Sequence, residues 1–252
     1  MNDRLFDFKD KVVLVTGGSR GLGRSMSLGF AERGADLIIA SRHQLSCDLV
    51  ATEIRALGRK ALPIATHIGR WGELEDLVEA AYREFGRVDV LINNAGMSPL
   101  ADSLLEVSEE LFDKITAVNF KGPFRLATLV GSRMAAGAGG SIINVSSIGA
   151  LMPSPYFGPY AGAKAALNAI SSALAIEYAP KVRVNVISPG GFLTDISGDW
   201  ADDQKGLDGV TLARFGKPEE IVTTALYLAS EHSSFTTNTN IRVDGGCRFV
   251  KT

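Results

Sequence analysis

A tyrosine and a lysine lie four residues apart in the segment YFGPYAGAKAAL, residues 156–167. If this segment is helical, Tyr160 and Lys164 project from one face, because residues i and i+4 are neighbours on a helix. A free phenol has a pKa near 10, so a tyrosine that works near pH 7 needs about 4 kcal/mol in favour of its phenolate. An ammonium group held nearby in a water-poor cleft can supply that energy. The pair predicts general acid–base chemistry at Tyr160, with Lys164 lowering its pKa.

The neighbouring Tyr156 is the weaker candidate for this chemistry. It has no lysine four residues further on, and Pro155 and Pro159 on either side of it indicate a loop. A tyrosine and a lysine at this spacing are also compatible with a half-buried helix face and a snorkelling lysine. The elements around the pair must therefore decide between the two interpretations.

Short β-branched apolar runs alternate with helical patterns along the 252 residues. Strands that are apolar throughout and are separated by helices are typical of a buried parallel sheet. We therefore expect an α/β fold, a doubly wound Rossmann-type parallel sheet of about seven strands with helices on both faces. Predicted strands cover residues 12–16, 36–41, 87–94, 141–147, 182–188 and 240–244, with a weaker candidate at 60–66 that contains a proline. Predicted helices cover residues 21–33, 44–57, 71–85, 108–135, 160–179 and 218–230.

We expect residues 1–252 to form a single domain, since no linker or repeat interrupts this alternation. The largest polar interruption, residues 197–209, is a candidate lid within a substrate loop near residues 192–212.

Composition excludes several classes of function. The net charge of −2 provides no basic field for nucleic acid. No apolar run reaches the length of a membrane helix. Cys47 and Cys247 form no CxxC pair, so neither a metal site nor a redox motif is expected. The first eleven residues, MNDRLFDFKDK, include several charges and contain no apolar signal region. We therefore expect a cytoplasmic location.

A glycine-rich loop, TGGSRGLG at residues 16–23, directly follows the first predicted strand. Gly17, Gly21 and Gly23 can form a tight turn that opens a helix and leaves backbone N–H groups free for a phosphate. The spacing differs from G-x-G-x-x-G, and a purely structural turn is the alternative.

The residues that follow the second strand indicate which dinucleotide would bind. Asp36 precedes this strand and belongs at its amino end, whereas ligands bind at the carboxyl ends. At the carboxyl end lie Ser41 and Arg42, with no carboxylate to hold a ribose 2′-hydroxyl. Arg42 and Arg20 can pair with a 2′-phosphate, which predicts NADP(H) over NAD(H). Solvated surface arginines, and a preference for NAD(H), are the alternatives.

With these motifs the sequence resembles the short-chain dehydrogenase/reductase family, in its single-domain branch. The resemblance covers essentially the whole chain. It rests, in the family's order, on TGGSRGLG (16–23), NNAG (93–96), Asn119, NVSS (144–147), YAGAK (160–164), NVISPGGFLT (185–194) and VDGG (243–246).

The resemblance implies a role for each of four catalytic residues. Tyr160 is the general acid/base, and Lys164 lowers its pKa and bonds the nicotinamide ribose. Ser147, 13 residues before the tyrosine, polarises the substrate carbonyl, while Ser146 points the other way. Asn119 holds a water of the proton relay.

The resemblance also implies a set of cofactor-binding residues, with Asn93 on the ribose side of the adenosine half. In place of the acidic residue that the family usually carries near adenine, this chain has His67 followed by Ile68. The expected set is Gly17, Ser19, Arg20, Gly21, Leu22, Gly23, Ser41, Arg42, His67, Ile68, Asn93, Ala95, Gly96, Tyr160, Lys164, Pro189, Gly190 and Thr194.

The expected activity is hydride transfer between NADP(H) and a small ketone or secondary alcohol. An NAD(H)-preferring dehydrogenase and a non-catalytic regulator that senses NADP(H) are the alternatives. The substrate is left open, with pocket residues expected at Met97, 151–157 and 192–200. The apolar helix that begins at Tyr160 implies, through the resemblance, a homotetramer or homodimer.

Overall fold

Seven parallel strands form one sheet in the part of the chain that the computed structural model describes, residues 4–194, 207 and 209–248. The strand order is β3-β2-β1-β4-β5-β6-β7, so the winding direction reverses between β1 and β4. This confirms the expected fold class and places a topological switch point, where such folds bind ligands, at the carboxyl ends of β1 and β4. The strands are β1 Val12–Thr16, β2 Asp36–Ser41, β3 Ala61–Ala65, β4 Val90–Asn93, β5 Gly140–Val145, β6 Val182–Pro189 and β7 Asn240–Val243.

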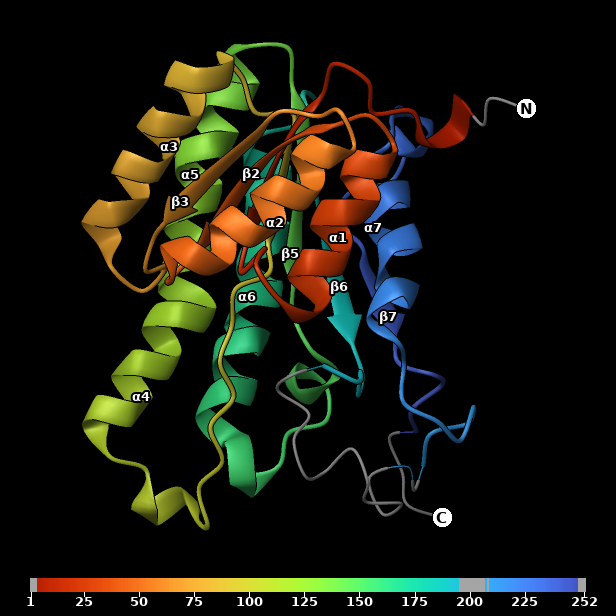
Figure 1. Ribbon diagram of the computed structural model, residues 1–252. Coiled ribbons are helices and arrows are strands. Elements are labelled where there is room, and N and C mark those ends of the chain that lie inside the picture. The colour runs from red at the N-terminus through yellow and green to blue at the C-terminus, as the bar shows by residue number, and fades with distance from the viewer. Residues whose placement is uncertain (1–3, 195–206, 208, 249–252) are drawn as a thin grey trace.

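Helices cover both faces of this sheet, as Figure 1 shows. Alternate residues of a strand point to opposite faces, so Val13 and Val15 of β1 pack into one hydrophobic cluster and Val12 and Leu14 into the other. The first cluster is completed by α1 Gly21–Glu32, α2 Gln44–Ala56 and α7 Val222–Ala229. The second is completed by α3 Trp71–Phe85, α5 Gly122–Ala136 and α6 Gly158–Glu177.

The weakest predicted strand is present as β3, and its position explains why its proline is tolerated. β3 pairs only with β2, at one edge of the sheet. A proline there withholds no N–H from a second neighbour.

The prediction of one continuous helix over residues 108–135 is wrong. It is divided into α4 Glu109–Thr116, a π-helical turn Ala117–Lys121, and α5. Asn119 Nδ2 donates to the carbonyl of Ile115 at 2.9 Å, and Pro123 has no N–H to give to the helical ladder. Both features loosen the regular i to i−4 pattern at this turn, and such turns are frequent at functional sites.

The loop near 192–212 is anchored at its base by main-chain hydrogen bonds. Leu193 N donates to the carbonyl of Gly216 at 2.8 Å, and Gly216 N donates to the carbonyl of Gly191 at 2.9 Å. Of the candidate lid at 197–209, only residues 207 and 209 lie within the described residues.

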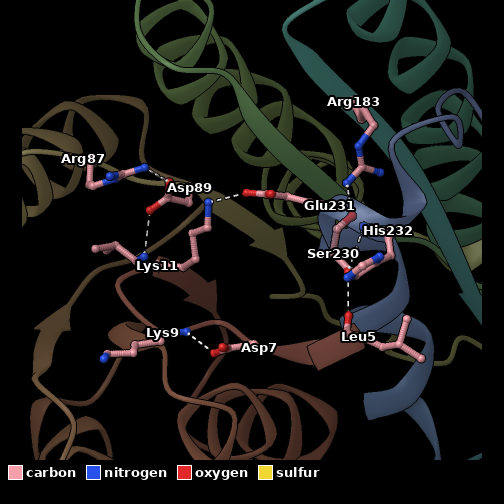
Figure 2. Close-up of polar contacts among 11 residues, drawn as sticks. Leu5, Asp7, Lys9, Lys11, Arg87, Asp89, Arg183, Ser230, Glu231 and His232 are labelled. Carbon is pink, nitrogen blue, oxygen red and sulfur yellow. Dashed lines mark hydrogen bonds and ion pairs between the residues drawn. The ribbon is translucent and has the colours of Figure 1, made fainter. Parts of the chain in front are cut away.

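At the opposite, amino end of the sheet, a carboxylate joins β1 to the segment before β4 (Figure 2). The buried Asp89 accepts the backbone N–H of Val12 at 2.9 Å and also pairs with Arg87. Nearby, Lys11 pairs with Glu231 at 2.6 Å, where the glutamate side chain is 83% exposed.

We expect these two carboxylates to differ in their contribution to stability. Asp89→Ala should lower the free energy of unfolding by about 2–3 kcal/mol, because the Val12 N–H is left buried without its acceptor. Glu231→Ala removes only an exposed ion pair and should cost less than about 1 kcal/mol. Urea titrations of both variants at equal protein concentration measure the difference, and equal losses would contradict this assignment.

Candidate active site

The Tyr160 and Lys164 side chains lie on α6 and meet the carboxyl end of β5. Lys164 is only 3% exposed, although it is charged. Its Nζ donates to the carbonyl of Val145, the last residue of β5, at 2.7 Å. The same Nζ lies 5.9 Å from the centroid of the Tyr160 ring. The structure therefore brings the two predicted residues together, with the ammonium buried and the Tyr160 side chain partly buried, whereas Tyr156 is 58% exposed.

Burial controls the acidity of both groups. Burial lowers the pKa of the Lys164 ammonium from 10.5 to about 8. Burial also raises the pKa of Tyr160, and a hydrogen bond from Ser147 opposes that rise only in part. In the protein by itself the net shift of the Tyr160 pKa is therefore upward, opposite to the expected direction. The reason is that desolvation of the phenolate dominates, while the ammonium is directed at the Val145 carbonyl.

Ser147 is held beside Tyr160 by its own local turn. It is the N-cap of a short 3-10 helix, Ile148–Ala150, and its Oγ accepts the N–H of Gly149 at 2.9 Å. A Cβ at Gly149 would lie 3.1 Å from the Phe157 ring and 3.3 Å from Ser147 Oγ. As expected, Ser146 faces elsewhere, since its hydroxyl donates to the carbonyl of Lys164 at 3.3 Å.

Asn119 lies in the π-helical turn and fixes the loop that follows β4. Its Nδ2 donates to the carbonyls of Met97 and Ile115, both at 2.9 Å, and its Oδ1 accepts the N–H of Met97 at 3.2 Å. Both protons of Nδ2 are thus used by the protein. A water in a proton relay would find only the second lone pair of Oδ1, so the role that the structure shows directly is positional.

The glycine loop is held at the switch point by Thr16, the first residue of the TGGSRGLG motif, which is not among the expected cofactor-binding residues. Its Oγ1 accepts the N–H groups of Asn94 at 3.0 Å and of Ala95 at 3.1 Å. Asn94 in turn donates from Nδ2 to the carbonyls of Thr16 and Gly17, at 3.0 and 3.3 Å. The signal available in the sequence was the position of Thr16, at the junction between strand and loop.

Glycine is required at three positions of this loop for steric reasons. Gly17 and Gly21 have φ of 63° and 51°, in the left-handed region. A Cβ at Gly23 would lie 2.1 Å from the carbonyl oxygen of Gly17, so the loop closes tightly onto α1. Backbone N–H groups at this helix start can bind a phosphate, and the cradle therefore fits a dinucleotide pyrophosphate.

A cavity of about 340 Å³ opens next to this loop. It brings Ser19, Arg20 and Gly21 together with Thr194, and all four are among the expected cofactor-binding residues. Leu22 and Gly23 continue the helix behind it. The lining also includes Leu193, from the range expected to line the substrate pocket. Four further lining residues were not expected, namely Arg24, Ser25, Pro218 and Glu219.

The Asn93 side chain is directed into the core, so the structure does not support a side-chain contact with the expected ribose. Asn93 is 1% exposed, and its Nδ2 donates inward to the Pro123 carbonyl at 3.2 Å and to Asn144 Oδ1 at 2.9 Å. Asn144 then donates to Ser171 on α6 at 2.8 Å. Asn93 therefore joins β4, β5 and α6 inside the core, because it belongs to the strand, while Ala95 and Gly96 form the loop at the surface of the site.

The residues expected near the adenosine 2′-position lie where the carboxyl end of β2 faces the glycine loop. Ser19 Oγ donates to Ser41 Oγ at 2.9 Å and joins the two segments. Arg20 and Arg42 are exposed, and neither side chain has a hydrogen bond or ion pair with any residue that the structure describes. The rejected Asp36 lies at the amino end of β2, where it pairs with Arg59 at 2.8 Å.

The remaining expected residues frame the two ends of the site. His67 and Ile68 follow β3, and Ile68 is buried. Pro189 ends β6, and Gly190 N donates to the Val243 carbonyl at 2.9 Å. Within the described ranges there is no cluster of three metal-ligating side chains and no helix long and apolar enough to cross a membrane.

The chain is similar in sequence and in structure to known dehydrogenases and reductases. The family model for short chain dehydrogenases matches residues 11–205. The chain is 35% identical over 242 residues to dehydrogenase/reductase SDR family member 4 of Pongo abelii, covering 94% of this chain and 87% of the relative. It is also 35% identical over 240 residues to a 3-oxoacyl-acyl-carrier-protein reductase of Thermotoga maritima, covering 94% and 97%. A solved short-chain type dehydrogenase/reductase from Mycobacterium marinum superposes with a TM-score of 0.91 at 34% identity, covering 96% of this chain and 97% of its own.

The burial of Lys164 should make the free energy of unfolding depend on pH. Below pH 8 the Lys164 ammonium is charged in the folded and unfolded chains alike, so the cost of burying it is fully present. Lys164→Met should therefore raise the free energy of unfolding at pH 7 by about 1–3 kcal/mol. Between pH 8 and 10.5 the folded chain loses this proton before the unfolded chain does, so the wild type gains stability. The advantage of the variant should shrink below about 1 kcal/mol at pH 10.

Urea unfolding of wild type and variant at the two pH values, without added dinucleotide, measures this difference. Lys60→Met, at an exposed lysine, is the control and should show neither effect. A Lys164→Met protein that is less stable than the wild type at pH 7 would refute the argument.

Proposed function

Because this chain belongs to the short-chain dehydrogenase/reductase family, we propose that it is an NADP(H)-dependent oxidoreductase that interconverts a ketone and a secondary alcohol. One observation carries the proposal. Ser147, Tyr160 and Lys164 lie together at the carboxyl end of β5, while the glycine cradle lies at the carboxyl end of β1. A protein that only bound a dinucleotide would need the cradle but not the three side chains.

When bound, the nicotinamide supplies or accepts the hydride. The chain's own residues then handle the oxygen of the substrate. Ser147 donates a hydrogen bond to the carbonyl oxygen and polarises it, and the protonated Tyr160 transfers its proton to that oxygen as charge develops. The raised pKa of Tyr160 keeps the phenol protonated, which is the form that carbonyl reduction requires. Oxidation runs through the phenolate, which the Lys164 ammonium stabilises electrostatically.

The preference for NADP(H) is supported by the groups around the end of β2. Two guanidinium groups, Arg20 and Arg42, flank the hydroxyl pair Ser19–Ser41, and neither is paired with a residue in the described part of the chain. These groups are donors suited to a phosphate dianion, and an NAD(H) site would instead present a carboxylate to the ribose.

The proposal includes a cytoplasmic homo-oligomer, a tetramer or a dimer. It is supported by the outer face of α6, where Gly162, Ala165 and Ala169 are exposed and Ile176 is 75% exposed. Small residues in a row permit close approach of a second helix, and an apolar face of this kind favours a protein partner over water.

The role of Tyr160 can be tested by removing only its hydroxyl group. Tyr160→Phe should lower kcat for ketone reduction by about 10² to 10⁴ fold, because no other group donates the proton, while the Kd for NADPH stays within about threefold. A panel of ketones with NADPH, followed by absorbance at the nicotinamide band, measures turnover, and fluorescence titration measures binding. A variant with near-normal kcat would disprove the assigned role. A wild type that binds NADPH but reduces no member of the panel would favour a sensor of NADP(H).

The cofactor preference can be tested at the two arginines. Arg20→Ala and Arg42→Ala should each weaken NADPH binding by about tenfold and leave NADH binding unchanged, because only NADPH has the 2′-phosphate. Arg33→Ala, an exposed arginine at the other end of α1, is the matched control. Tighter binding of NADH than of NADPH by the wild type would overturn the preference.

A further inference from the structure

The segment that follows β7, residues 244–248, lies beside residues 209–213, near the end of the expected substrate loop. We call residues 244–248 the strap. Val210 and Cys247 face each other in an antiparallel bridge between the two segments. Their backbone hydrogen bonds run from Leu212 N to the Gly245 carbonyl at 2.9 Å and from Arg248 N to the Gly209 carbonyl at 3.0 Å. The end of the loop is therefore paired with the strap.

The contact between these two segments is close. A Cβ at Gly246, which has a φ of 77°, would lie 2.9 Å from Thr211 Cβ, and Thr211 Oγ1 donates to the Gly246 carbonyl at 2.7 Å. Two residues further along the loop, Ala213 has a φ of 49°. A non-glycine residue keeps this left-handed conformation only where its surroundings hold it. Pairing with the strap therefore restrains the backbone of residues 209–213.

The strap itself is held by one side chain of β7. Arg242 Nε donates to Asp244 Oδ2 at 2.8 Å, and Nη2 of the same arginine donates to the carbonyl of Cys247. Asp244 is 6% exposed in its side chain, and its Oδ1 accepts the N–H of Gly246 at 3.0 Å. The planar guanidinium suits this place, because its fixed fork of donors can bond a carboxylate and a carbonyl at once. Arg242 therefore fixes both ends of the strap's turn.

The base of the strap is also attached to the end of β6. Gly190 N donates to the Val243 carbonyl at 2.9 Å, and a Cβ at Gly190 would lie 2.8 Å from Asp244 Cα. A few residues after Gly190, Leu193 and Thr194 line the cavity beside the glycine loop. The strap thus sets the position of residues 209–213 relative to the segment that lines this cavity.

We propose that Arg242 is a positioning residue for the substrate, which acts by holding the strap and, through the strap, the end of the substrate loop. This inference rests on the proposed function, because it requires that a ketone or alcohol binds beside Ser147 and Tyr160. Arg242 contributes to substrate affinity through the Cys247 carbonyl and Asp244 and takes no part in proton or hydride transfer.

The chain contains a second arginine–aspartate pair with the same spacing, which serves as a matched control. Arg87 pairs with Asp89 at the opposite end of the sheet, and this aspartate side chain is also almost buried, at 10% exposed (Figure 2). A general loss of stability should follow from removing either arginine. A displaced substrate loop should follow only from removing Arg242.

The first measurement follows hydrogen exchange of single backbone amides by NMR, without added dinucleotide or substrate. In Arg242→Met the Leu212 and Arg248 amides, which join loop and strap, should exchange at least about tenfold faster than in the wild type. The Leu193 and Gly216 amides, at the other junction of the loop, should stay within about threefold of the wild type. Arg87→Met should leave the Leu212 and Arg248 amides unchanged.

The second measurement compares steady-state kinetics with NADPH and three ketones, namely 2-octanone, cyclohexanone and acetophenone. For each ketone that the wild type reduces, Arg242→Met should raise KM at least about fivefold and keep kcat within about threefold, because binding is lost while the catalytic side chains stay in place. The Kd for NADPH should stay within about threefold. Arg87→Met should change none of these constants by more than about twofold.

The loop side of the pairing provides a second variant that keeps the arginine. Thr211→Val removes only the hydroxyl donor to the Gly246 carbonyl, in a side chain of nearly the same shape. It should accelerate exchange of the Leu212 amide and raise KM by at least about twofold, again with little change in kcat. If circular dichroism shows that Arg242→Met is unfolded, this variant decides, and unchanged exchange and KM would contradict the inference.

Three further results would overturn it. Unchanged exchange at Leu212 and Arg248 in a folded Arg242→Met would mean that Arg242 does not hold the strap. Faster exchange with an unchanged KM would mean that the strap does not position the substrate. A fall in kcat with no rise in KM, or the same changes in Arg87→Met, would indicate a different role or a general loss of stability. A wild type that binds NADPH but reduces no ketone would refute the proposed function, whereas the exchange result does not depend on turnover.

Discussion

The hydrogen bond from the buried Lys164 ammonium to the carbonyl of Val145 is the constraint on which the site depends. A charge with almost no exposed surface is stable in a protein only when its protons have partners. The main-chain oxygen at the end of β5 provides one, and it ties α6 to the strand that leads into Ser147. The Ser146 hydroxyl also donates to the Lys164 carbonyl, so the end of β5 and α6 are joined by two hydrogen bonds, one at each of two consecutive residues of the chain. The position of Tyr160 relative to Ser147 follows from this double attachment.

The other half of the site is organised by one hydroxyl group at the switch point. Thr16 accepts two N–H groups from the segment after β4, and Asn94 returns two bonds to the loop after β1. The two segments that separate at the reversal of strand order are thus bound to each other just below the place where a ligand would lie. A cradle fixed in this way does not have to be ordered when the ligand arrives, which reduces the entropic cost of binding.

The sequence was sufficient for those features that depend on local pattern. The apolar β-branched runs predicted all seven strands, and the glycines after the first of them predicted the loop that opens α1. The spacing of four residues on a predicted helix selected Tyr160 and Lys164, and the family resemblance added Ser147. Features that depend on how elements pack could not be read in this way. Asn93 and Asn94 are adjacent and identical, yet one faces the core and the other the loop, because the strand ends between them. The direction of the Tyr160 pKa depends on desolvation, which spacing along a helix does not report.

The paired main-chain hydrogen bonds that join Gly216 to Gly191 and Leu193 make the segment between them tolerant of change. A segment whose two ends are already joined can change in length or composition at little additional entropic cost, since loop closure depends only weakly on length. Ser147, Tyr160 and Lys164 lie outside this junction. Substitutions within the segment can therefore change which molecules fit beside these side chains while the side chains keep their places.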